Sequence, residues 1–282
     1  MKQIITLIIS SNLLVLPLNA QSWKVEKKEE IRQTLKFSNP STAKEIAVDN
    51  INGSITVAGY EGKEVQLVAH KTIYARSPEK VREAEQDVRL EITEKNNSIR
   101  LYVDGPFRCE NCRGQRYSGY EVNFDFELKI PREADFYLKT VNDGDIKVTD
   151  VAGEYDVKNV NGGIEMNEVS GAGRVYALNE DVKILFKKNP AAESYFGSLN
   201  GDVEISFRPN LAADLRFKTF NGEVFTDFPV TYLANATPIR ERRKGKNVYR
   251  YDRASKVRVG SGGPELEFDA FNGDIRILRR KQ

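Results

Sequence analysis

Acidic residues beside short Asn-Gly turns are the side chains in this sequence best suited to carry out chemistry. They are Asp143, Asp145, Asp202 and Asp274. Paired carboxylates hydrolyse glycosidic bonds, so these residues suggest an enzyme that acts on polysaccharide. Carboxylates also bind calcium, and the same aspartates could instead line up as a ladder of weak calcium sites. The glycine-rich nonapeptide of calcium-binding β-rolls is missing, so we expect no bound metal and no cofactor.

No other arrangement of residues predicts a catalytic site. His70 is the single histidine, and it falls in the alternating stretch Val65–His70, so we interpret it as a strand residue rather than a ligand. The sequence has no phosphate-binding loop, dinucleotide fingerprint or His-Glu-x-x-His motif. Glu121, Asp125 and Glu127 alternate along one predicted strand, which is typical of a solvated face. We therefore expect no catalytic residues.

Cys109 and Cys112 are the only cysteines, and two residues separate them. In an oxidising compartment such a pair favours a local disulfide that closes a loop. A redox-active pair would begin a helix, whereas the flanking residues here have the composition of a loop. A zinc site needs four ligands, which one histidine and two cysteines cannot supply. The sequence leaves open whether the two thiols are bridged.

The first twenty residues have the composition of a secretory signal peptide. Lys2 gives a positive start, Ile4–Leu18 is mostly apolar, and Ala20 is a small residue at the expected cleavage position. A membrane anchor is the alternative, but about 15 apolar residues are short for a span. No cysteine directly follows Ala20 to carry a lipid, and no second apolar run of membrane length follows Gln21. We expect an exported mature protein in the periplasm or at the cell surface.

The composition is that of a folded chain with an extensive solvated surface. Of its 282 residues, 40% are hydrophobic and 30% are charged. The formal net charge of +2 lacks the basic excess that nucleic-acid binding requires. An all-β fold can use this length as one domain, and we predict one continuous domain over residues 21–282.

A short unit recurs along the chain: Asn, usually Gly, a polar or small residue, and then an apolar, a polar and a second apolar residue. Its turn residues are Asn52 and Gly53, Asn142 and Gly144, Asn161 and Gly162, Asn200 and Gly201, Asn221 and Gly222, and Asn272 and Gly273. A degenerate copy at Asn179 lacks its glycine. Because Asn and Gly tolerate positive φ, we expect them to turn the chain at little steric cost. The triplet after each turn predicts a strand with one buried face.

The spacing of this unit predicts an all-β fold, a β-solenoid. Its first apolar positions are Ile146, Ile164, Val182, Val203 and Val224, which are 18 to 21 residues apart. This coil length has room for two short strands. A meander of antiparallel hairpins is the alternative, because Asn-Gly between alternating runs is also a hairpin signal. The near-constant coil length favours the solenoid, in which successive asparagines can form a hydrogen-bonded ladder.

Residues 21–135 differ from the repeat coils of residues 136–282. They carry the first strands, the cysteine loop and one short predicted helix near residues 78–88. Ser77 can cap this helix, Pro78 suits its first turn, and Glu79 lies near the positive end of its dipole. We expect this part to open the solenoid.

A basic segment at about residues 229–259 interrupts the repeats. Its residues include Arg240, Arg242, Arg243, Lys244, Lys246 and Arg250. The simpler interpretation is a solvated loop or hairpin. The alternative is a patch for an acidic polysaccharide, a lipid head group or an acidic protein, because insertions into solenoids commonly carry binding.

Three stretches of the chain together resemble the bacterial putative-adhesin family, an extracytoplasmic domain of unknown function. They are residues 48–57, residues 126–135 and the Asn copies that follow Thr140. The resemblance extends from about Val25 to Ile277; it implies a β-solenoid and supplies no active-site pattern. We expect a noncatalytic module that binds cell-envelope polysaccharide or an envelope protein. A polysaccharide-acting enzyme and an accessory partner in envelope-stress signalling are the alternatives.

Overall fold

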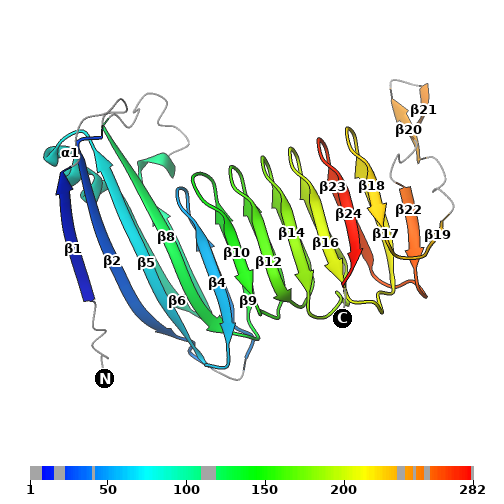
Figure 1. Cartoon of the computed structure of the whole chain (residues 1–282), viewed down its shortest axis with the longest axis horizontal. Coiled ribbons are helices and arrows are strands. Elements are labelled where there is room, and N and C mark those ends of the chain that lie inside the picture. The colour runs from blue at the N-terminus through cyan, green and yellow to red at the C-terminus, as the bar shows by residue number, and fades with distance from the viewer. Residues whose placement is uncertain are drawn as a thin grey trace.

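The described part of the chain folds into two large sheets that face each other across one hydrophobic core (Figure 1). The computed structural model describes residues 8–15, 23–39, 42–108, 119–233, 239–243, 246–250 and 255–280. Of residues 8–15, 239–243, 246–250 and 255 it describes the backbone alone. We name the sheets A and B.

Each repeat unit forms one coil with a strand in each sheet. A coil runs along sheet B, turns at its asparagine and returns along sheet A. The coil strands of sheet B are β9 (Asp135–Thr140), β11 (Tyr155–Asn159), β13 (Gly173–Ala177), β15 (Ser194–Ser198), β17 (Ala213–Thr219) and β23 (Glu265–Ala270). Those of sheet A are β10 (Ile146–Thr149), β12 (Ile164–Val169), β14 (Val182–Phe186), β16 (Val203–Phe207), β18 (Val224–Thr226) and β24 (Ile275–Arg279). Neighbouring coils pair in parallel, which confirms the predicted solenoid and excludes the hairpin meander for the repeats.

The N-terminal part opens the stack with one more coil and several longer strands. That coil consists of β3 (Glu45–Asp49) and β4 (Ile55–Tyr60). Sheet A continues beyond it through β8 (Tyr120–Pro131), β5 (Glu64–Ala75), β2 (Val25–Lys36) and β1 (Ile8–Val15), and sheet B continues through β7 (Ser98–Asp104) and β6 (Arg89–Lys95). A 3-10 turn, η1 (Pro106–Arg108), follows β7. Except for β8 on β4 and β7 on β3, these added strands pair antiparallel.

Strand β1 falls within the predicted signal peptide and pairs antiparallel with β2. Its neighbours, residues 1–7 and 16–22, lie outside the described residues. Cleavage after Ala20 therefore stays a prediction.

The predicted short helix is confirmed as α1 (Pro78–Asp87). Ser77 precedes it with an extended backbone, and its side chain accepts a hydrogen bond from the Lys80 N–H at 3.4 Å. Val81 and Ala84 are buried beside the long strands. The helix therefore packs on the N-terminal end of the core.

The last coil of the chain lies inside the stack rather than at its end (Figure 1). Strand β24 pairs with β16 on one side and β18 on the other, and β23 lies between β15 and β17. Phe268 of this inserted coil is buried among Phe196, Phe207 and Phe217, with ring centres 5.5, 6.4 and 5.6 Å away. The order of coils in the stack thus differs from their order in the sequence.

The middle of the basic segment forms a hairpin, one of the two forms that the simpler prediction gave, but the ends of the segment join a sheet. Its two ends form β19 (Val230–Tyr232) and β22 (Ser255–Val259), which extend sheet B antiparallel beyond β17. Only its middle forms the hairpin β20 (Ile239–Arg243) and β21 (Lys246–Arg250). The burial of Val257 and Val259 explains why these ends join the sheet.

Seven asparagines form a continuous hydrogen-bonded ladder along the turns of the described coils. In each step the side-chain amide of one asparagine donates to the side-chain oxygen of the asparagine in the preceding coil of the stack. From the N-terminal end of the stack, the ladder consists of Asn52, Asn142, Asn161, Asn179, Asn200, Asn272 and Asn221, and the successive distances are 3.0, 2.8, 2.7, 2.9, 2.8 and 2.8 Å. This confirms the predicted ladder and includes Asn179, whose copy lacks the glycine. The ladder fixes the register of each coil on the next.

The turn glycines have a different role from the one predicted. Of the six, only Gly53 has positive φ, at 107°. At Gly201 a Cβ would overlap the backbone carbonyl of Glu180 in the preceding coil, and at Gly162 it would overlap the carbonyl of Gly144. At these two turns glycine is therefore required because the coils approach too closely for a side chain, whereas at Gly53 the positive φ also favours it, as expected.

We expect Gly201→Ala to lower the free energy of unfolding by about 1–3 kcal/mol, because the added methyl group forces two stacked turns apart. Gly163→Ala is the matched control, since its Cβ would meet no atom closer than 3.6 Å. Urea unfolding of both variants measures the difference. Equal losses in the two variants would contradict the close-approach explanation.

Candidate functional site

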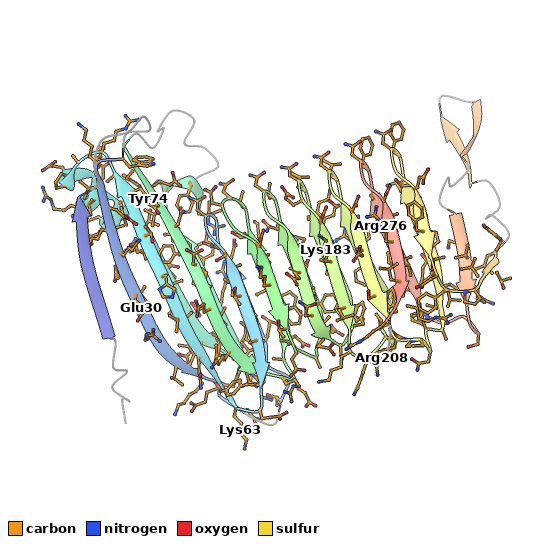
Figure 2. All side chains as sticks on the ribbon, viewed as in Figure 1. Glu30, Lys63, Tyr74, Lys183, Arg208 and Arg276 are labelled. Atoms are coloured by element: carbon orange, nitrogen blue, oxygen red, sulfur yellow. The ribbon has the colours of Figure 1, made fainter. Side chains whose placement is uncertain are left out.

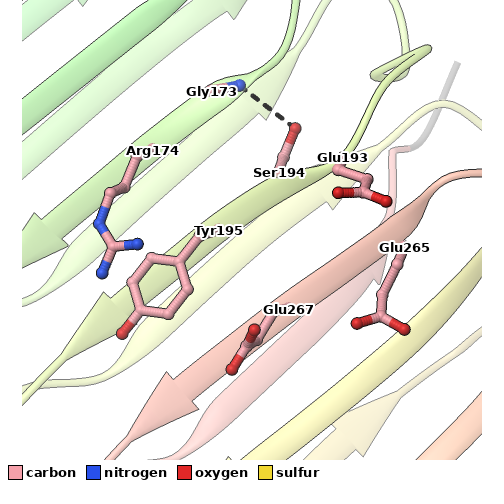
Figure 3. A pocket seen from close by; sticks show the side chains of 7 residues that line it. All are labelled: Gly173, Arg174, Glu193, Ser194, Tyr195, Glu265 and Glu267. Atoms are coloured by element: carbon pink, nitrogen blue, oxygen red, sulfur yellow. Dashed lines mark hydrogen bonds between the residues drawn. The ribbon is translucent and has the colours of Figure 1, made fainter.

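A shallow pocket of about 230 Å³ lies on the outer face of sheet B, over β13, β15 and β23 (Figure 3). Its lining residues are Gly173, Arg174, Glu193, Ser194, Tyr195, Glu265 and Glu267. The parallel register places Arg174 beside Tyr195, and Tyr195 beside Glu267. Strands separated by some seventy residues of sequence therefore supply adjacent side chains.

Tyr195 lies at the centre of this pocket, and its neighbours hold the ring in place. The Arg174 guanidinium carbon is 3.8 Å from the ring centre, which is a cation–π contact. Gly197 leaves room for the ring two residues further along the strand, since a Cβ there would lie 2.8 Å from the phenol oxygen. Burial, with a smaller contribution from the Asp269 carboxylate, raises the pKa of Tyr195, so the phenol is neutral at physiological pH.

Three glutamates also line this pocket, and they differ in their partners. Glu267 pairs with Arg216 at 3.4 Å, and Glu265 pairs with Lys256 at 2.7 Å. Glu193 is exposed and has no ion-pair partner among the residues that the structure describes. Carboxylates accept hydrogen bonds from ligand hydroxyl groups, and Glu193 is available to do so without breaking an ion pair.

The same pocket lacks the pairing that nucleophilic catalysis needs. Its one aliphatic hydroxyl group, on Ser194, accepts a hydrogen bond from the Gly173 N–H at 3.3 Å (Figure 3) and donates to the Ala192 carbonyl at 3.3 Å. The single histidine, His70, lies in β5 of the other sheet, 3.7 Å from the carboxylates of Glu30 and Glu127. This confirms His70 as a strand residue and excludes a Ser-His pair.

The aspartates beside the repeat turns stabilise the stack. Asp145, Asp202 and Asp274 lie in one column at the edge of sheet A, and each accepts a backbone N–H from the next coil, at 2.9, 2.9 and 3.0 Å. Asp143 does not join them; it is exposed in its turn, with φ of 56°. The predicted group of four is therefore a column of three hydrogen-bonded side chains and one separate residue.

An ion pair makes Asp202 still less suited to act as a catalytic acid. Arg276 lies on β24 (Figure 2) and pairs with both Asp202 and Asp274. Burial disfavours the charged form of Asp202, but the hydrogen bonds from Arg276 and the Asp274 N–H outweigh it and lower its pKa. A general acid in glycoside hydrolysis needs a raised pKa, so Asp202 is poorly suited to that role. Among the described residues, no group of three or more potential ligand side chains could hold a metal ion.

Several predicted site residues cannot be assigned a side-chain environment. Cys109, Cys112 and Lys244 lie outside the described residues. The backbone of β20 carries Arg240, Arg242 and Arg243, and that of β21 carries Lys246 and Arg250. The structure thus places these five basic residues on one hairpin without describing their side chains, and the predicted patch stays a prediction.

The residues of the Tyr195 pocket were not predicted from the sequence. Arg174 and Tyr195 look like ordinary polar-face residues in short alternating strands. The one available signal was Gly197, a glycine two residues after a tyrosine within a strand, because such a glycine often marks a close approach.

A family model described as Toastrack DUF4097 matches residues 22–259. No curated protein matches the chain. Similar solved structures include a putative cell adhesion protein from Clostridium sporogenes, 14% identical, with a TM-score of 0.33, covering 90% of this chain and 100% of that one. A putative adhesin from Bacteroides fragilis is 12% identical, with a TM-score of 0.30 and coverages of 89% and 97%. A putative lipid binding protein from Parabacteroides distasonis is 10% identical, with a TM-score of 0.33 and coverages of 88% and 96%.

The described residues include no helix that is long and apolar enough to cross a membrane.

We expect Asp202→Asn to make the protein less sensitive to acid. Because the folded pKa of Asp202 lies below its ordinary value of 3.8, its carboxylate stabilises the fold above about pH 4 and loses this contribution as the pH falls through the folded pKa. Unfolding free energies measured from pH 5 to pH 2 should therefore fall less steeply in the variant. Asp143→Asn is the control and should retain the wild-type slope.

Proposed function

The chain belongs to the Toastrack DUF4097 family, and we propose that it is a noncatalytic exported module that binds cell-envelope polysaccharide through the outer face of sheet B. The observation that carries this proposal is the arrangement around Tyr195. A fixed aromatic ring lies in a solvent-facing pocket, between a guanidinium group and three carboxylates. The predicted signal peptide supports the exported location.

This combination of groups suits a sugar chain. Sugars present C–H surfaces that pack on aromatic rings and hydroxyl groups that hydrogen-bond to carboxylates. The pocket is shallow and lies on parallel strands, so an extended chain can pass over it without entering a cavity. Since Arg174, Tyr195 and Glu267 lie on strands and Glu193 directly precedes β15, these groups are already ordered before the ligand arrives.

Hydrolysis of the same ligand is the less well supported function. Three of the four turn aspartates, Asp145, Asp202 and Asp274, accept backbone N–H groups, and Asp202 is also paired with Arg276. Ser194 has no histidine beside it. The structure thus favours binding over turnover.

The basic hairpin offers a second contact for an acidic polysaccharide. Arg240, Arg242, Arg243, Lys246 and Arg250 lie on β20 and β21. Their contribution would be electrostatic, and it should weaken as salt rises, whereas the packing of a sugar on Tyr195 should not.

We expect Tyr195→Ala to weaken retention on envelope polysaccharide at least tenfold, because the variant loses the ring on which the sugar packs. Purified peptidoglycan fragments and O-polysaccharide serve as probes, and binding is measured by affinity electrophoresis across a salt series. Tyr137→Ala is the matched control, since Tyr137 is exposed on β9 of the same sheet.

The outcomes separate the candidate functions. Loss of binding in Tyr195→Ala alone supports the pocket. Loss only when Arg240, Arg242 and Arg243 are neutralised would move the site to the hairpin. Release of new reducing ends, abolished by Glu193→Gln, would replace the binding function with an enzymatic one.

A further inference from the structure

The two sheets end differently at the C-terminal end of the stack. Sheet B continues beyond β17 through β22 and β19, whereas sheet A ends at β18 (Figure 1). No described strand pairs with the outer edge of β18. At the opposite end of sheet B, the edge strand β6 carries exposed Arg89, Glu91, Glu94 and Lys95, which discourage further pairing. Strand β18, with the sequence Val-Phe-Thr, has no charged residue.

A core position of β18 is left uncovered. Val224 pairs with Ile275, which in turn pairs with Val203, so all three occupy the same inward-facing position. Val224 is 38% exposed, while Ile275 and Val203 are both 0% exposed. One more strand beside β18 would cover Val224 as β24 covers Val203.

The backbone of β18 has hydrogen-bonding groups that face away from the stack. Ile275 N–H donates to the Glu223 carbonyl at 2.9 Å, and Asp227 N–H donates to the Ile277 carbonyl at 3.4 Å. Because pairing alternates along a strand, the N–H and C=O groups of Val224 and Thr226 point to the open side. A parallel strand on that side would satisfy them.

The asparagine ladder and the column of acidic side chains both end at the coil that contains β18, and each ends with a hydrogen-bond acceptor that has no donor from a further described coil. Asn221 donates to Asn272 at 2.8 Å, and its own side-chain oxygen has no partner in the described part of the chain. Glu223 donates its N–H to Asp274 at 3.0 Å and occupies the next position in the column of acidic side chains. Every earlier asparagine of the ladder receives an N–H donor from the next coil, and so does each aspartate of the column, namely Asp145, Asp181, Asp202 and Asp274. A parallel strand added at this end of the stack, in the register of the coils, would supply N–H donors to both acceptors.

From these observations we infer that the open edge of β18 binds an extended segment of a partner protein as an added parallel strand. The segment would carry Asn at the ladder position and apolar side chains at alternate positions after it, the first of which covers Val224 as Ile275 does on the inner side. Such strand addition uses main-chain hydrogen bonds for affinity and side-chain positions for specificity.

A second copy of this chain fits the edge less well. In each described coil other than the one that contains β18, both strands already have neighbours on both sides. Two β18 strands related by a twofold axis would run antiparallel, which places their Asn221 side chains at opposite ends. Neither arrangement extends the ladder.

A synthetic peptide of residues 270–279 tests the inference, because it has the required pattern and its strand already pairs in parallel with β18 on the inner side. We expect saturable binding of the labelled peptide to the purified full chain in fluorescence anisotropy. Amide exchange at residues 223–227 should slow when the peptide binds. Val224→Lys should weaken binding at least tenfold, whereas Tyr232→Lys, at the exposed edge strand β19, should leave it unchanged.

Unaltered binding to Val224→Lys, or protection that appears elsewhere in the chain, would overturn the inference. Faster exchange in β24 would mean that the peptide replaces the inserted coil, which also contradicts it. A dimer that forms without peptide and is lost in Val224→Lys would identify a second copy as the occupant instead. If Val224→Lys does not fold, a peptide N-methylated at alternate amides replaces it: equal affinity for methylated and unmodified peptide would exclude strand addition.

Discussion

Successive turns of this protein stack backbone against backbone, and the rest of the molecule follows from that contact. At Gly201 and Gly162 no side chain fits between one coil and the next. The coils can therefore approach to the spacing of hydrogen-bonded strands, about 4.8 Å. At that spacing, identical positions in successive coils come into contact. The asparagines form a ladder, the aspartates meet backbone N–H groups, and Tyr195 lies beside Arg174.

A polar residue that repeats in every coil of a solenoid lies next to the following coil, so its hydrogen-bonding groups are first used between coils and not for a ligand or for catalysis. The aspartates illustrate this constraint, because the periodicity that made them resemble a catalytic or calcium-binding row is the periodicity that fixes them in the structure. The pocket around Tyr195 has the opposite character. Its residues do not repeat from coil to coil, so no ladder joins them, and Glu193 has no ion-pair partner among the described residues.

The sequence was informative wherever the repeat itself decided the structure. Coil boundaries, the parallel stacking, the Asn ladder and helix α1 all followed from local patterns around residues such as Asn161 and Ser77. The position of the β23–β24 coil in the stack could not be predicted from the sequence. Each coil presents nearly the same edge to its neighbour, so local sequence patterns do not indicate which two coils it lies between. The pocket was hidden for a related reason: Glu267 lies beside Tyr195 only because β23 was inserted next to β15.

The inserted coil has a consequence for how the chain folds as it is made. A solenoid ordinarily grows by adding each coil to the one before it. Here β17 and β18 reach their final place only when residues 265–279 are present to lie between them and β15–β16. The separation of Asn200 and Asn221 equals that of Asn179 and Asn200, so an incomplete chain can seat the later coil directly on β15–β16. In such an intermediate β17–β18 would occupy the place of β23–β24, and residues 265–279 would have to displace them to reach the observed order.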